Sequence, residues 1–194
     1  MVKVFISEED FSYNSFLLGD KILESGFKPN YLVAVSRGGT PPGIRVHEFL
    51  ERYGAECICH PIRTNGYPEP EKMSKKIIVS GLDYLVHNVN SDDKLLIIDD
   101  VFDTGLSMEA ILNKMQKEMR KNFPNDIRVG TVYFKPEKNK TKLIPDYFVL
   151  EAGKDDWIYF PHELDGLEGD ELYEAKGPRI AELVLRRDAE YKLK

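Results

Sequence analysis

Three carboxylates and a pair of hydroxyl side chains gather in one short stretch of this 194-residue chain. Asp99 and Asp100 directly follow four aliphatic residues, 95–98, and Asp103 comes just before a Thr-Gly-Leu-Ser segment, 104–107. The aliphatic run predicts a strand buried on both faces, as at the centre of a parallel sheet. The Thr-Gly turn and the serine predict that a helix begins there.

This placement favours an anionic ligand. Where the carboxyl end of a strand meets a helix N-terminus, free N–H groups and the helix dipole converge. Asp99 and Asp100 would repel a phosphate unless they bind a cation, a sugar hydroxyl or a developing positive charge. The pattern therefore suggests a phosphorylated sugar bound with a metal ion. An acidic turn followed by a helix cap is the purely structural alternative.

Length and composition limit the function classes. The chain is 42% hydrophobic and 31% charged, typical of a soluble globular protein, and its length suits one α/β domain. No apolar run approaches the roughly 20 residues that span a bilayer, and residues 1–6 are too short for a signal peptide, so we expect a cytoplasmic protein without a membrane partner. The net charge of −6 argues against broad nucleic-acid binding, although local cations can still hold an anionic substrate.

Strand and helix patterns alternate along most of the chain. We expect strands at 2–6, 31–35, 55–63, 77–79, 95–98, 128–134 and 146–150, and helices at 11–25, 44–53 and 108–121. This alternation predicts an α/β fold with a mostly parallel sheet. Ser7 with Asp10 predicts a capped helix start. Cys57 and Cys59 are expected to be free thiols, and the tail 168–194 to be helical with a break at Gly177.

Residues 95–107 closely resemble the phosphoribosyl pyrophosphate (PRPP) signature of the type I phosphoribosyltransferases. That signature is a hydrophobic strand, two acidic residues, two spacers, then Asp-Thr-Gly and Ser or Thr. The resemblance implies the type I phosphoribosyltransferase fold, with a mostly parallel twisted sheet, helices on both faces and a small hood. We expect residues 1–167 to form this domain, core plus base-binding hood, and residues 168–194 to form a helical C-terminal extension.

The same resemblance gives each residue of the signature a role. Asp99 and Asp100 would bind the ribose hydroxyls of PRPP, directly or through Mg²⁺. Residues 103–107 would cradle the 5′-phosphate with backbone amides and hydroxyl groups. Asp103 matches a position that, in the 6-oxopurine branch, lies near N7 of the base and accepts a proton. The complete ribose and 5′-phosphate set is Asp99, Asp100, Asp103, Thr104, Gly105, Leu106 and Ser107.

A second loop, with the sequence Ser36, Arg37, Gly38 and Gly39, lies where another expected strand passes into a helix. Its two glycines leave backbone amides open to an anion, and Arg37 adds a planar cation with several donors. Such a turn is also common without a ligand. The loop resembles the pyrophosphate loop of 6-oxopurine phosphoribosyltransferases, which implies pyrophosphate binding and a cis peptide bond between Ser36 and Arg37.

A third segment carries a resemblance to a base-binding site. Its pattern, Trp-Ile-x-x-Pro-x-acid from Trp157 to Glu163, resembles that of xanthine–guanine and archaeal-type purine phosphoribosyltransferases. The resemblance implies that Trp157 stacks on the base, that Ile158 offers backbone groups and that Glu163 helps to hold a second Mg²⁺. Lys135 matches the lysine that donates to O6 of a 6-oxopurine. Taken alone, a single Trp completes a core as readily as it stacks on a ligand.

The implied reaction is Mg²⁺-dependent transfer of 5-phosphoribosyl from PRPP to a 6-oxopurine, giving a nucleoside monophosphate and pyrophosphate in purine salvage. Guanine, hypoxanthine and xanthine stay open as the preferred base, and we expect a homodimer or tetramer. The polar stretch 64–76 takes the place of the family's closing lid but lacks the Ser-Tyr pair of human-type enzymes. A non-catalytic regulatory protein that binds a purine nucleotide or PRPP with the same fold is therefore the alternative.

Overall fold

A computed structural model describes residues 2–68 and 75–191, with side chains described outside 66–76. These residues form two compact units, one from residues 1–13 and 155–194 and the other from residues 14–154, and each is described by itself. Within the described ranges, no helix is both long and apolar enough to cross a membrane. The domain boundary expected after residue 167 stays a prediction.

The larger unit is built on a six-stranded sheet with the order β4-β3-β2-β5-β6-β7. Neighbouring strands are parallel except β4, which runs antiparallel to β3. The strands are β2 (Tyr31–Ser36), β3 (Ile58–Pro68), β4 (Lys75–Ser80), β5 (Lys94–Phe102), β6 (Asp126–Phe134) and β7 (Tyr147–Glu151). The predicted mostly parallel sheet, with the aliphatic run of residues 95–98 in a central strand, is confirmed.

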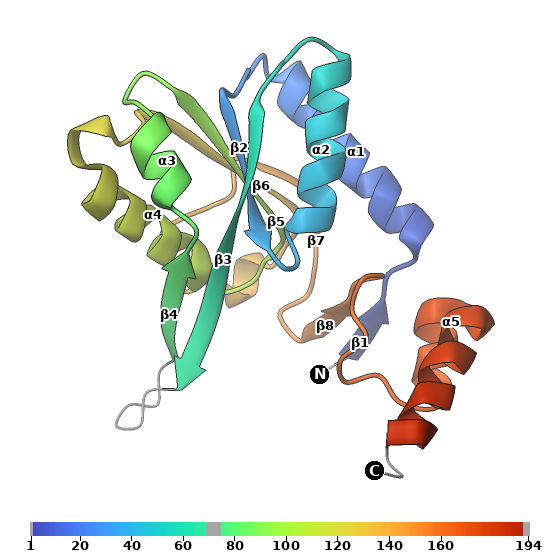
Figure 1. Ribbon diagram of the computed structural model, residues 1–194. Helices are drawn as coiled ribbons and strands as arrows, with labels where there is room; N and C mark the ends of the chain where they lie inside the picture. Colours follow the sequence, from blue (N-terminus) through green and yellow to red (C-terminus); the bar gives the residue numbers. More distant parts are fainter. Residues whose placement is uncertain (1, 69–74, 192–194) are drawn as a thin grey trace. The chain divides into compact units, whose positions relative to one another are not determined.

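Helices cover both faces of this sheet. They are α1 (Glu8–Glu24), α2 (Thr40–Arg52), α3 (Asp83–Asn88) and α4 (Leu106–Met119), with short 3₁₀ turns η1 (Arg120–Asn122) and η2 (Pro136–Lys138). Figure 1 shows α3 and α4 on one side of the sheet and α2 on the other. The core on the α4 side includes Val33, Val35, Leu85, Leu95, Ile97, Ile111 and Met115. On the opposite side a Cβ added at Gly130 would meet Ile98, Leu18 and Ile22.

Some elements differ from the sequence prediction. β3 continues to Pro68 and β4 begins at Lys75, so part of the expected lid, 64–76, forms an antiparallel ladder in which Thr64 pairs with Val79. The sequence did not show these strands, because residues 64–76 are mostly polar and do not alternate with apolar residues. Residues 69–74 of that lid lie outside the described residues. Helix α3 was not predicted, because six residues are too few to show a helical period.

The smaller unit joins the two ends of the chain. β1 (Val2–Phe5) pairs in parallel with β8 (Asp156–Tyr159), and α5 (Asp170–Tyr191) packs in the same unit. A small core of Tyr159, Leu167, Leu172 and Ala181 joins β8 to this helix. Gly177, with φ 72° and ψ 168°, breaks α5 ahead of Pro178, as the sequence predicted. The helical tail therefore shares a core with the segment that carries Trp157.

Candidate active site

Three neighbouring strands bring most of the predicted site residues together. In β2, β5 and β6 the register pairs Ala34 with Ile98 and Ile98 with Gly130. All three strands run in the same direction, so the loops that follow them leave the sheet at its carboxyl end. These are the predicted pyrophosphate loop, the predicted phosphate cradle and the loop that begins at Lys135.

The acidic pair lies at the end of β5. Asp100 is buried, with 8% of its surface exposed, and Asp99 is partly buried. The Asp100 amide donates to Asp99 Oδ1 at 3.1 Å, and the Val101 amide donates to Asp100 Oδ1 at 2.7 Å. Burial, together with the adjacent Asp100 carboxylate, raises the pKa of Asp99 well above its usual range. Two carboxylates held this close favour a cation or sugar hydroxyls as their partner.

The loop after β2 lies directly against these carboxylates. The Ser36–Arg37 peptide bond is cis, as the resemblance implied. A Cβ at Gly38 would overlap the Asp100 carboxylate, and one at Gly39 would overlap the carbonyl oxygen of Ile98. Only glycine fits at these two positions, because the loop backbone packs on the end of β5. The predicted pyrophosphate loop and the predicted ribose site are therefore adjacent.

The segment after β5 has the form of an anion cradle. Gly105 adopts a left-handed conformation, with φ 76°, and α4 begins at Leu106. Among the described residues no side chain caps this helix, so its first amides are open to a ligand. A small cavity of about 70 Å³ lies here, lined by Asp99, Val101, Phe102, Asp103, Thr104, Gly105, Ser107 and Met108. The residues predicted to hold the 5′-phosphate thus surround one hollow, with the exception of Leu106.

Asp103 lies between two lysines. Its Oδ2 accepts a hydrogen bond from Lys138 Nζ at 2.9 Å, and Lys135 Nζ lies 3.9 Å from the same oxygen. Lys135 is buried, with 3% of its surface exposed. Asp103 Oδ1 is also buried, and it has no hydrogen-bond partner among the described residues. The structure thus places Lys135, predicted to meet the base, beside the predicted proton acceptor.

Part of this arrangement was not predicted from the sequence. Beyond Lys138, the loop after β6 holds the cradle through its backbone, because the Lys140 amide donates to the Thr104 carbonyl oxygen at 3.0 Å. A Cβ at Gly105 would collide with Thr141 and Asn139. The basic composition of residues 135–142 was the available signal, but it does not say which lysine reaches Asp103.

Two of the predicted base-binding residues, Trp157 and Ile158, belong to the smaller unit, whereas Lys135 belongs to the larger one. Trp157 lies on β8 with 45% of its surface exposed, whereas its neighbour Ile158 is buried. Glu163 Oε2 accepts a hydrogen bond from the Phe160 amide at 3.0 Å. Trp157 therefore has a free aromatic surface, whereas one oxygen of Glu163 already has a partner within its own turn.

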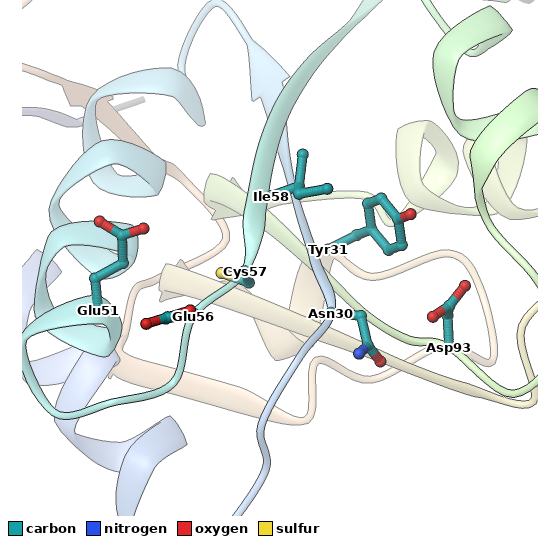
Figure 2. A pocket seen from close by; sticks show the side chains of 7 residues that line it. All are labelled: Asn30, Tyr31, Glu51, Glu56, Cys57, Ile58 and Asp93. Carbon is teal, nitrogen blue, oxygen red and sulfur yellow. The ribbon is translucent and has the colours of Figure 1, made fainter.

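A separate hollow lies at the amino ends of the strands. It encloses about 720 Å³ around the starts of β2 and β3, and Figure 2 shows the carboxylates of Glu51, Glu56 and Asp93 around it. None of the predicted site residues lines it. Beside it, His47, Glu48 and Glu51 hold their ligand atoms within 4.8 Å of one another, but His47 Nε2 already lies 2.9 Å from the Cys57 carbonyl oxygen.

Comparison with known families agrees with this geometry. Residues 15–167 match the family described as "Phosphoribosyl transferase domain". The chain belongs to this family. The match covers β2, β5, β6 and all of the loops that follow them. As a phosphoribosyltransferase with a mostly parallel α/β sheet, the protein has the type I fold that its PRPP signature implied.

Individual relatives are distant but cover most of the chain. A xanthine-guanine phosphoribosyltransferase of Desulfotalea psychrophila is 28% identical over 160 residues, which is 82% of this chain and 86% of that protein. The crystal structure of a purine phosphoribosyltransferase from Pyrococcus horikoshii has 26% identity and a TM-score of 0.67, covering 87% of this chain and 99% of the other. A hypothetical protein from Neisseria gonorrhoeae with bound ppGpp shares the fold, with 24% identity and a TM-score of 0.69 over 94% of this chain and 97% of its own.

Proposed function

We propose that this protein transfers the 5-phosphoribosyl group of PRPP to N9 of a 6-oxopurine, releasing pyrophosphate and a purine nucleoside monophosphate. The observation that carries the proposal is the pairing of Asp103 with buried Lys135, 3.9 Å apart, at the head of the anion cradle. A carboxylate accepts a proton from the purine ring, and a neighbouring ammonium donates to its O6. One side of the site thus suits a phosphorylated sugar and the other suits a 6-oxopurine.

The proposed chemistry needs positioning more than covalent catalysis. As in glycoside cleavage, departure of a leaving group from the anomeric carbon leaves oxocarbenium-like charge on the sugar. Asp99 and Asp100 would hold the ribose hydroxyls, while the N-terminus of α4 holds the 5′-phosphate. Arg37 and the amides of Gly38 and Gly39 would neutralise the departing pyrophosphate. Asp103 takes the proton that the purine loses when N9 forms its new bond.

The proposed base preference depends on the hydrogen-bonding group that each purine carries at position 6. Lys135 donates a hydrogen bond to the exocyclic O6, which suits guanine, hypoxanthine or xanthine, whereas the 6-amino group of adenine is itself a donor. Relatives named as xanthine-guanine enzymes point the same way. Trp157 would stack on the purine through its exposed ring, and the backbone of Ile158 would contact the edge of the base. Orotate and adenine are the less favoured bases.

Magnesium is the metal that this site suits. The donor set of Asp99 and Asp100 is all oxygen, as Mg²⁺ prefers. Burial and then the adjacent Asp100 carboxylate raise the pKa of Asp99, and a cation would relieve the repulsion between the two carboxylates. Mg²⁺ would neutralise pyrophosphate as it leaves. Glu163 is proposed to hold a second ion through water, using the carboxylate oxygen that the Phe160 amide does not occupy. We further propose a cytoplasmic homodimer or tetramer, since symmetric homo-oligomers are the commonest soluble oligomers.

The test is a parallel assay of purified protein with PRPP, Mg²⁺ and each of guanine, hypoxanthine and xanthine, with adenine and orotate as controls. We expect nucleoside monophosphate and pyrophosphate in equal amounts with at least one 6-oxopurine, and less product after chelation of Mg²⁺. No product with any of the three bases would contradict the proposal. Tight binding of a purine nucleotide without turnover would instead favour the regulatory alternative.

A further inference from the structure

We propose that Lys138 is a positioning residue for Asp103, which it holds by Oδ2 so that Oδ1 is left to accept from the purine. This inference rests on the proposed function, in which Asp103 takes the proton of the base. Neither the PRPP signature nor the base-binding pattern contains Lys138, which lies outside both.

The distances separate the roles of the two lysines. Lys138 Nζ lies 2.9 Å from Asp103 Oδ2, within hydrogen-bond range, whereas Lys135 Nζ lies 3.9 Å from the same oxygen, beyond hydrogen-bond range. A charge-assisted hydrogen bond orients a carboxylate more firmly than a distant charge does. Lys138 therefore fixes Asp103, and the ammonium of Lys135 stays close enough to meet O6 of a base.

The backbone around Lys138 is itself fixed on the cradle. The Lys138 amide donates to the Lys135 carbonyl oxygen at 3.1 Å, closing the turn η2, and the Lys140 amide donates to Thr104 O at 3.0 Å. Farther along, the Asn139 side chain donates to the Leu143 carbonyl oxygen at 2.7 Å. The lysine is thus presented to Asp103 by a loop with hydrogen bonds on both sides of it. Catalytic carboxylates work best when their supporting shell is held in this way.

The second carboxylate oxygen of Asp103, Oδ1, is available to accept a hydrogen bond from a ligand. Asp103 Oδ1 is buried and has no partner among the described residues, which is costly for a charged acceptor. An N–H of a bound purine would satisfy it. With Oδ2 occupied by Lys138, Oδ1 is the oxygen left to accept that proton.

A purely structural ion pair would behave differently. The side chains of Lys138 and Asp103 are 32% and 35% exposed, and ion pairs this open to water contribute little to stability. Removing Lys138 should therefore leave the fold almost unchanged and act on turnover. This difference separates positioning from a structural contribution.

The experiment is a double-mutant cycle of Lys138→Ala and Asp103→Asn, with Lys138→Arg, Lys138→Met and, as a matched surface control, Lys142→Ala at an exposed position of the same loop. Lys138→Ala should lower kcat for the preferred base about fivefold to tenfold with the KM for PRPP and the melting temperature unchanged. Lys138→Arg should restore kcat to within about twofold, because the guanidinium also donates to Oδ2. In the Asp103→Asn background Lys138→Ala should have no further effect.

Three outcomes would overturn the inference. The first is a normal kcat for Lys138→Ala. The second is that Lys138→Ala lowers kcat by the same factor in the Asp103→Asn background as in the wild type. The third is that kcat stays as low in Lys138→Arg as in Lys138→Ala. Should Lys138→Ala unfold, Lys138→Met keeps the aliphatic stem and gives the same comparison. If the wild-type protein has no turnover, the proposed function fails on its own. In that case the affinity of the same variants for hypoxanthine, with PRPP present, is measured by calorimetry. The positioning role is overturned if hypoxanthine does not bind, or if the effects of Lys138→Ala and Asp103→Asn on its affinity simply add.

Discussion

At the scale of single residues, Asp103 has the most direct role in the proposed reaction, because it accepts the proton of the purine. Asp103→Asn keeps the size of the side chain but removes the basic oxygen, so we expect kcat to fall by about 10²-fold, the usual contribution of a general base. PRPP affinity should change by less than about threefold, because the cradle amides, not this carboxylate, hold the phosphate. Steady-state kinetics with both substrates varied would measure this. Asp92→Asn, at an exposed turn, is the matched control, and equal activity of Asp103→Asn and wild type would remove the proposed role.

Cys57 allows a test of burial that does not depend on function. Burial, with smaller contributions from Cys59 and Glu51, raises the pKa of its thiol to about 12. The thiolate is the reactive form, so at pH 8 alkylation by iodoacetamide should be about 10³-fold slower than for a thiol with the ordinary value. The rate should rise about tenfold per pH unit up to pH 11. Mass spectrometry would measure the alkylation rate of Cys57 in the Cys59→Ser variant, in which Cys57 is the single cysteine. Rapid labelling at pH 8 without denaturant would contradict the burial of Cys57.

The site residues that belong to a recognised motif were predicted from the sequence, whereas Lys138, which belongs to none, was missed. Asp99, Asp103 and Gly105 lie within one signature, so their proximity follows from the chain itself. Lys138 is separated from Asp103 by 35 positions and meets it only because β5 and β6 are parallel neighbours. No local pattern distinguishes it from the other lysines of its loop.

At the scale of elements, the start of α1 depends on a side-chain cap. The Asp10 amide donates to Ser7 Oγ at 3.0 Å, and the Ser7 hydroxyl donates to Asp10 Oδ2 at 2.6 Å, as the sequence predicted. Ser7→Ala leaves that amide without its acceptor and should lower the free energy of unfolding by about 1 kcal/mol. Urea denaturation followed by circular dichroism would measure the loss. Ser7→Asp, which keeps a cap, should lose much less, and equal losses would argue against capping.

Elements were predictable where a local sequence signal, such as an aliphatic run or a Gly-Pro pair, defines them. The strand at β5 follows from Leu95 and its aliphatic neighbours, and the break in α5 follows from Gly177. β8 was not predicted, because four residues become a strand only by pairing with β1 at the far end of the chain. A contact of such long range leaves no periodicity in the sequence.

At the scale of the whole molecule, the negative overall charge does not extend to the proposed phosphate sites. The chain carries a net charge of −6, yet PRPP, the proposed substrate of the cradle, carries a 5′-phosphate and a pyrophosphate. Lys135, Lys138 and Arg37 come from two loops at the carboxyl end of the sheet, next to open amides of α4. Local cations of this kind act within a Debye length of about 10 Å, so overall charge does not decide whether PRPP binds.

The last prediction tests whether the larger unit binds PRPP while the smaller unit contributes to binding of the base. All proposed PRPP residues lie in the larger unit, whereas Trp157 and Ile158 lie in the smaller one, whose core contains fully buried Leu172. Leu172→Ala opens a cavity in that core and should lower the free energy of unfolding of this unit by about 2–5 kcal/mol. Because β8 packs on the same core, the KM for the purine should rise while the KM for PRPP stays within about twofold.

The matched control is Leu183→Ala, a change of the same size on the same helix at a side chain that is 51% exposed. It should alter stability by less than about 0.5 kcal/mol and leave both KM values unchanged. Hydrogen exchange adds a direct readout, since Leu172→Ala should speed exchange in peptides covering 156–159 and leave those covering 94–102 protected. If the KM for PRPP rose in parallel with that for the purine, the effect of the smaller unit would not be specific to the base, and the assignment of Trp157 to the base would lose its support.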